Sequence, residues 1–174
     1  MKRITIPQII RKMMKEFKGD IRDTDHALRV WTNANCVGEL EGLDPETQFI
    51  LEATAITHDI ACPICREKYG DTEADHQEKE GEVEVRRFFA DSGLTQKEID
   101  RIAFIVRHHH SYEYIDGPDF QILVEADFIA NAAEKRYSKE RIREFLNNTM
   151  KTESGKQFLG APNFLGAVAK LSVR

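Results

Sequence analysis

The sequence has few cysteines, no long hydrophobic run and no excess of positive charge. Three cysteines, Cys36, Cys62 and Cys65, are too few for a disulfide framework in a chain of 174 residues. No apolar stretch approaches the roughly 18 residues that a membrane span needs, and the N-terminus MKRITIPQII lacks the features of a signal peptide. A formal net charge of -5 argues against binding to long nucleic acids or to anionic membranes. We therefore expect a cytoplasmic protein with reduced thiols.

Signals for β-strands are also missing, since the sequence has neither period-two alternation nor hairpin dipeptides. Apolar residues recur instead at helical spacing, which predicts a single-domain, all-α bundle of about seven helices over residues 1–174. Residues 60–74 and 111–118 are predicted to be loops. The predicted helices begin near Thr5, Thr24, Asp44, Asp75, Thr95, Asp119 and Ser138, and the apolar residues between Phe164 and Leu171 suggest a last short helix.

Two of the predicted helix starts have strong local signals. Asp44 is an N-cap residue followed by a proline, which is well suited to the first helical position. Thr95 and Glu98 have the spacing of a capping box. Caps without such support are predicted at Asp75 and Asp119.

Histidines and aspartates occur at positions where the helical pattern predicts buried side chains. His26 shares a helix face with Val30, and Asp127 follows Leu123 by four residues. Such side chains must be paired, hydrogen-bonded or bound to a metal when buried. One such residue alone is more often a satisfied core side chain, but a set on several helices favours a shared metal centre. The candidate ligands are His26, His58, Asp59, His76, His109, His110 and Asp127.

The order and surroundings of these residues carry a resemblance to a known family. His26, the pair His58-Asp59 and Asp127 resemble the H…HD…D signature of the HD superfamily of metal-dependent phosphohydrolases. The segments DTDHALRVWTNA, ILEATAITHDIA, HQEKEGEVEVRRFF and VEADFIANA resemble the family's segments around these positions. The resemblance covers about residues 20–135 and implies a helical bundle with a metal site at its centre, in agreement with the predicted helices.

The resemblance also implies which residues bind metal. His26, His58, Asp59 and Asp127 would hold one divalent ion, and Asp59, as the catalytic carboxylate, would be able to bridge to a second. His76, His109 and His110 match positions that bind the second ion in two-metal members of the family. Among the three adjacent histidines, His109 is expected to be the main ligand and His110 its neighbour at the site, whereas His108 would point outward or support a ligand without binding metal itself. The expected cofactor is thus a divalent metal, present as two ions. The metal could be Fe, Mn, Zn, Ni or Mg, because imidazole and carboxylate ligands do not select among such metals.

The implied function is that of a phosphomonoesterase or phosphodiesterase acting on a nucleotide or a similar small phosphorylated metabolite. A metal-bound hydroxide would serve as the nucleophile, because coordination lowers the pKa of water to about 7 in favourable sites. Arg66 and Lys68 follow the His-Asp pair and could contact a substrate phosphate, or they could simply be solvated loop residues.

Two alternatives remain open at the level of sequence. The chain could be a non-catalytic helical domain that binds a metal or a nucleotide as a sensor or scaffold. Cys62 and Cys65 could form half of a structural zinc site, although a matching pair of ligands is missing from the sequence. A homo-oligomer is compatible with either function.

Overall fold

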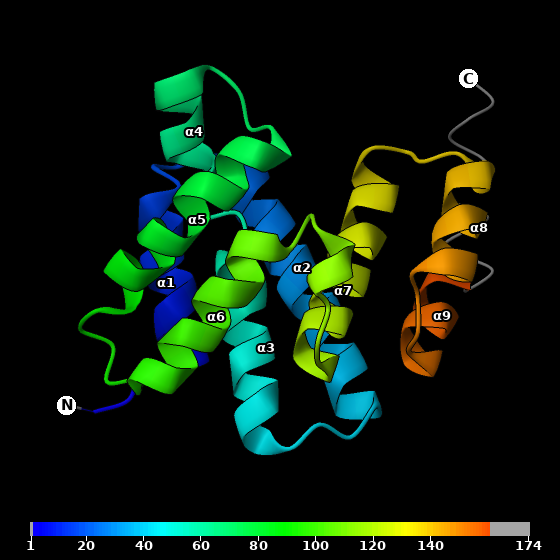
Figure 1. Ribbon diagram of the computed structural model, residues 1–174, viewed down its shortest axis with the longest axis horizontal. Coiled ribbons are helices and arrows are strands. Elements are labelled where there is room, and N and C mark those ends of the chain that lie inside the picture. Colours follow the sequence, from blue (N-terminus) through cyan, green and yellow to red (C-terminus); the bar gives the residue numbers. More distant parts are fainter. Residues whose placement is uncertain (1, 161–174) are drawn as a thin grey trace.

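The computed structural model describes residues 2–160, and that part of the chain is built from helices without any strand (Figure 1). The predicted all-α class is therefore confirmed. Nine α-helices lie in the described part, where about seven were predicted. They are α1 (Ile6–Glu16), α2 (Ile21–Leu40), α3 (Pro45–Thr57), α4 (Cys62–Tyr69), α5 (Ala74–Phe89), α6 (Gln96–His108), α7 (Pro118–Glu134), α8 (Lys139–Asn148) and α9 (Glu153–Gly160), with a 3-10 turn, η1 (Tyr112–Tyr114), between α6 and α7. No helix of residues 2–160 is both long and apolar enough to cross a membrane.

Helix α3 lies at the centre of the bundle. It separates α1, α5 and α6 on one side from α2 and α7 on the other (Figure 1). Leu51 of α3 belongs to the hydrophobic cluster shared with α2 and α7, whereas Ile56 belongs to the cluster shared with α1, α5 and α6. Eight of the thirteen residues of α3 are buried. The residues that follow α3, His58 and Asp59, therefore emerge in the middle of the molecule.

Side-chain caps begin several of these helices as the sequence predicts. The carboxylate of Asp44 accepts hydrogen bonds from two backbone N–H groups in the first turn of α3. At α6, the Thr95 hydroxyl accepts a hydrogen bond from the backbone N–H of Glu98, and the Glu98 carboxylate accepts one from the backbone N–H of Thr95. Both predicted starts are confirmed. These caps satisfy N–H groups that the helix itself leaves without partners.

The loop predicted at residues 60–74 was wrong, because Cys62–Tyr69 forms α4. Pro63 lies in the first turn of this helix, and Gly70 ends it in the left-handed conformation with a φ of 81°. Only Cys62 and Cys65 are buried on α4, so the helix is too short and too polar to produce an apolar stripe that repeats. The signals that could have identified α4 were Pro63 and Gly70, which bracket it.

Other elements also differ from the prediction, and α2 begins at Ile21 instead of near Thr24. Helix α7 is capped by Gly117 instead of Asp119, whose carboxylate pairs with Arg101 of α6 at 2.6 and 2.8 Å. Helix α5 starts after Glu73, ahead of the predicted cap at Asp75. The predicted loop 111–118 contains the turn η1, and α9 was not predicted. The last predicted helix, between Phe164 and Leu171, lies outside the described residues.

A buried carboxylate fixes the segment before α9 to α7. Glu125 is fully buried, and its Oε1 atom accepts hydrogen bonds from the backbone N–H groups of Lys151 at 2.6 Å and Thr152 at 3.1 Å. The side-chain amide of Gln121 donates to the same oxygen at 2.7 Å.

We expect Glu125→Ala to lower the free energy of unfolding by about 2–4 kcal/mol, because the substitution leaves these donors without a partner and creates a cavity. Urea denaturation measures the change. Glu153→Ala provides the control, since Glu153 is exposed at the start of α9 and should change stability by less than about 0.5 kcal/mol. Equal effects of the two substitutions would contradict the assigned role of Glu125.

Candidate metal centre

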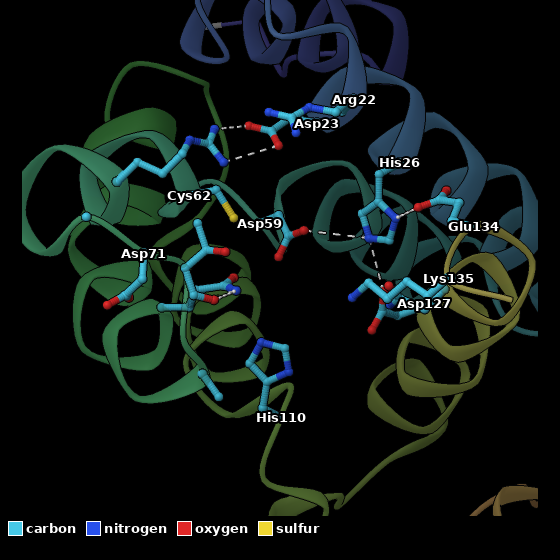
Figure 2. Close-up of a pocket in the computed structure, with 16 residues that line it drawn as sticks. Arg22, Asp23, His26, Asp59, Cys62, Asp71, His110, Asp127, Glu134 and Lys135 are labelled. Atoms are coloured by element: carbon cyan, nitrogen blue, oxygen red, sulfur yellow. Dashed lines mark hydrogen bonds and ion pairs between the residues drawn. The ribbon is translucent and has the colours of Figure 1, made fainter. Parts of the chain in front are cut away.

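The ends and inner faces of four helices bring a group of histidines and aspartates together. His26 comes from α2, His58 and Asp59 from the end of α3, His109 from the end of α6, and Asp127 from α7. His58 is only 1% exposed and His109 only 4%. A cavity of about 510 Å³ opens beside the group, and His26, Asp59 and Asp127 line it (Figure 2).

Four of these side chains converge closely. The Nε2 atom of His26 lies 3.1 Å from Oδ1 of Asp127 and 3.3 Å from Nε2 of His58. The Nε2 atom of His58 lies 3.5 Å from Asp59 and 3.6 Å from Asp127. Figure 2 shows the ring of His26 next to the carboxylates of Asp59, Asp127 and Glu134. Two imidazole nitrogens and two carboxylates thus face one small volume, and these are ligand types that divalent transition metals accept.

The hydrogen bonds on the outer side of each ring leave Nε2 free for a ligand. Nδ1 of His58 donates to the backbone carbonyl of Ala55 at 2.9 Å, and Nδ1 of His109 donates to that of Val106 at 2.7 Å. Because a carbonyl oxygen can only accept, Nδ1 carries the hydrogen in the neutral form of each ring, and Nε2 then carries the lone pair. Burial acts to lower the pKa of His58, but Asp59 and Asp127 outweigh burial and raise it, so the protonated form of His58 must lose the proton on Nε2 before it binds a metal ion. Nε2 of His109 is buried and has no hydrogen-bond partner among the described residues. A buried lone pair of this kind fits metal coordination.

His26 is oriented by a residue that the sequence analysis did not identify. Its Nδ1 atom lies 3.0 Å from Oε2 of Glu134, on the last turn of α7. A carboxylate behind the histidine is a common arrangement around metal ligands, because it fixes the ring and raises its basicity. Asn131 plays a similar part for Asp127, since its side-chain amide donates to Oδ1 at 2.7 Å.

The carboxylates around His26 determine its charge in the metal-free protein. Burial acts to lower the pKa of His26, but Asp127, Asp59 and Glu134 together outweigh burial and raise the pKa to about 9. The imidazole is therefore protonated at pH 7 and must lose that proton before Nε2 can bind a metal ion.

We expect metal binding at pH 7 to release about one proton from His26. The apparent affinity should rise about tenfold for each pH unit between 7 and 9 and then level off, because the competing proton is lost through that range. Calorimetric titration of the metal-free protein with Mn²⁺, in two buffers of different ionisation enthalpy, counts the protons released. An affinity that does not change between pH 7 and 9 would show that His26 is not a ligand.

His109 and His110 lie beside the four-residue group. The Nε2 atom of His109 is 3.8 Å from Oδ1 of Asp59. Burial, together with His110 and His58, lowers the pKa of His109 to about 3, so its imidazole is neutral at pH 7. The His110 ring centroid lies 3.9 Å from that of His109, and His110 lines the cavity (Figure 2). Oδ1 of Asp59 therefore faces the buried ring of His109, and His110 lies beside that ring at the cavity.

The structure does not bring His76 to this group. Its Nδ1 atom is 2.7 Å from Asp71, and its ring stacks on Tyr69 at a centroid distance of 3.9 Å. The next residue, Gln77, lines the cavity instead, with a buried Oε1 atom that has no hydrogen-bond partner among the described residues. His108 also faces away from the centre, since its ring stacks on Tyr114 at 4.2 Å.

Of the two basic residues proposed for phosphate binding, only Arg66 lines the cavity, and its guanidinium pairs with Asp23. Lys68 pairs instead with Glu80 at 2.7 Å. Lys135, at the end of α7, also lines the cavity and has no ion pair among residues 2–160 (Figure 2). Sequence reasoning missed Lys135 because it lies in no motif, far along the chain from the His-Asp pair.

The two cysteines of α4 take no part in a metal-binding group in the described part of the chain. Cys62 and Cys65 are free, buried thiols, and burial raises the pKa of both. Within residues 2–160, the one group of three or more metal-type ligands whose atoms all lie within 4.8 Å of one another consists of His26, His58 and Asp59, and Asp127 adjoins it at 3.1 Å from His26. A zinc site at the cysteines would need further ligands that this part of the chain does not supply.

The chain is similar to a known protein family and to a solved structure. A family model described as the HD domain matches residues 24–147. The fold is similar to the crystal structure of a protein from an uncultured Thermotogales bacterium, described as a predicted HD superfamily hydrolase, with a TM-score of 0.65 and 21% sequence identity. The match covers 96% of this chain and 87% of that one. No curated protein matches the chain significantly.

Proposed function

This chain belongs to the HD domain family, and we propose that it is a metal-dependent phosphohydrolase acting on a nucleotide or a similar small phosphorylated metabolite. The observation that carries the proposal is the convergence of the Nε2 atoms of His26 and His58 with the carboxylates of Asp59 and Asp127 at the wall of an open cavity. A purely structural cluster would not need a cavity of this size beside it.

The four convergent residues fit one divalent ion. When bound, such an ion supplies positive charge that attracts a phosphoryl group and activates water near neutral pH. Glu134 keeps His26 in orientation, and Asn131 does the same for Asp127. These contacts hold the ligands in place without a substrate, so little reorganisation is needed when one binds.

We also propose that Lys135 contacts the substrate phosphate. Its ammonium group has no ion pair among the described residues and therefore keeps its charge available to an incoming anion. Arg66 is less suited to this role, because Asp23 already neutralises its guanidinium.

A second ion is part of the proposal. Asp59 has one oxygen toward His26 and His58 and the other toward His109, so Asp59 would hold one ion together with His26 and His58 and a second ion together with His109. His109 and His110 would complete the second site. His76 is not included, because it pairs with Asp71.

The test is to purify the protein without chelators, measure its bound metals, and then assay phosphomonoesters and phosphodiesters with added Mn²⁺ or Ni²⁺. We expect bound transition metal and turnover that stops on chelation and returns with metal. Tight binding of metal or nucleotide without turnover of any phosphoester would favour the alternative of a non-catalytic sensor or scaffold.

A further inference from the structure

A second cavity, of about 610 Å³, adjoins the metal centre. It lies among α7, α8 and the turn η1, and it shares His110, Asp127, Asn131 and Lys135 with the first cavity. Four aromatic side chains line it, and we call it the aromatic cleft. They are Tyr112, Phe128, Tyr137 and Phe145. A molecule with a phosphate at the metal centre can therefore extend directly into this cleft.

The phenylalanines and the tyrosines have different roles in the cleft. Phe128 and Phe145 stack on each other at a centroid distance of 3.6 Å, and both are buried, so they form its fixed wall. Tyr112 is 43% exposed and meets the edge of Phe145, whereas Tyr137 is half-buried beside Phe128. The tyrosine rings thus keep surface that no described residue covers.

A cation and several polar groups complete the lining. The guanidinium of Arg141 lies 3.7 Å from the centroid of the Tyr137 ring and has no ion pair among residues 2–160. A planar cation stacked on an aromatic ring presents a flat surface to a further planar group. Glu144, Asn148 and Thr149 add hydrogen-bonding groups on the same side of the cleft.

We propose that the aromatic cleft binds the base of a nucleoside monophosphate whose phosphate lies at the metal centre. The inference rests on the proposed function and narrows its substrate to mononucleotides. Any of the bases can stack on aromatic side chains, and polar groups then recognise the edge of a particular base. The size of the cleft lies within the range of pockets for small ligands. A phosphorylated sugar without a base would make no contact with Tyr112, Tyr137 or Arg141.

The test compares nucleoside 5′-monophosphates with ribose 5-phosphate, which has the same sugar and phosphate but no base. The Mn²⁺-loaded protein is assayed for phosphate release from both. We expect the best nucleotide to have a kcat/KM at least about 100-fold above that of ribose 5-phosphate, from stacking and hydrogen bonds together.

Variants then assign the preference to the cleft. Tyr137→Leu and Tyr112→Leu should each lower the ratio of the two kcat/KM values by roughly 5- to 100-fold, mainly through a higher KM for the nucleotide. Arg141→Met should lower the ratio in the same direction. Tyr114→Leu is the matched control, because Tyr114 is also exposed but stacks on His108 outside the cleft, and it should leave the ratio unchanged.

The outcomes separate the inference from the proposed function. If the kcat/KM values for the nucleotides and for ribose 5-phosphate are equal, the proposed base site is overturned, but the proposed phosphohydrolase function still stands. If no phosphoester is turned over, the proposed function fails, and calorimetric titration with AMP, GMP, CMP and UMP tests the cleft directly. Binding that weakens in Tyr137→Leu but not in Tyr114→Leu would support the cleft, and absence of binding by all four nucleotides would overturn it.

Discussion

Asp59→Ala is expected to abolish metal-dependent phosphoester hydrolysis while leaving a folded helical protein. Its carboxylate lies within 3.5–3.8 Å of the Nε2 atoms of His26, His58 and His109, and no other residue faces all three rings in this way among the described residues. Removing a residue that only supports a metal ligand typically lowers activity by about 10- to 100-fold. Removing Asp59, which would itself bind metal, should therefore lower activity by more than roughly 100-fold. Turnover by the Mn²⁺-loaded variant measures the effect.

A matched control separates loss of the centre from loss of the fold. Asp100→Asn removes an exposed carboxylate on α6 that pairs with Arg86 and does not line the cavity, and it should retain full activity. Both variants should keep the helical circular dichroism of the wild type. Turnover near the wild-type level in Asp59→Ala would exclude the proposed mechanism.

His109→Ala is expected to have the second largest effect. The substitution removes the buried imidazole whose Nε2 atom has no hydrogen-bond partner among the described residues and faces Asp59. We expect the metal content to fall toward one ion per chain and the activity to fall at least roughly tenfold, because the second ion would lose its main ligand. Elemental analysis of the purified variant gives the stoichiometry.

The neighbouring histidines provide the comparison for His109. His108→Ala should leave metal content unchanged, since its ring stacks on Tyr114. His76→Ala should also have little effect, because the structure pairs His76 with Asp71. If His76→Ala lowers the metal content as much as His109→Ala, then His76 is a ligand of the second ion. If neither variant loses metal, the centre is mononuclear.

The sequence by itself determined the fold class and the four residues that converge most closely. Helix starts such as Thr95 could be predicted because capping depends on contacts between residues three positions apart. The helical pattern marked seven histidines and aspartates as candidate ligands, because a buried polar side chain needs a partner, and the resemblance to the HD superfamily singled out His26, His58, Asp59 and Asp127 among them. Burial and local hydrogen bonding are both encoded in short stretches of sequence.

The choice between His76 and its neighbour needed the tertiary structure. Successive side chains on a helix point about 100° apart around its axis. If the residue that faces the metal centre is predicted one position too early, the wrong side chain is placed at the centre. Gln77, and not His76, lines the cavity. The spacing of histidines along the chain could not reveal this, because the orientation of α5 is fixed by its packing on α6.

Only the tertiary structure decided which charges are free and which are paired. Arg66 meets Asp23 from a different helix, and Lys135 reaches the cavity from the end of α7 without an ion pair in the described part of the chain. Glu134 supports His26 across 108 positions of sequence. Such contacts depend on how helices pack, because side chains that are distant in sequence become neighbours only when the apolar faces of their helices are buried together.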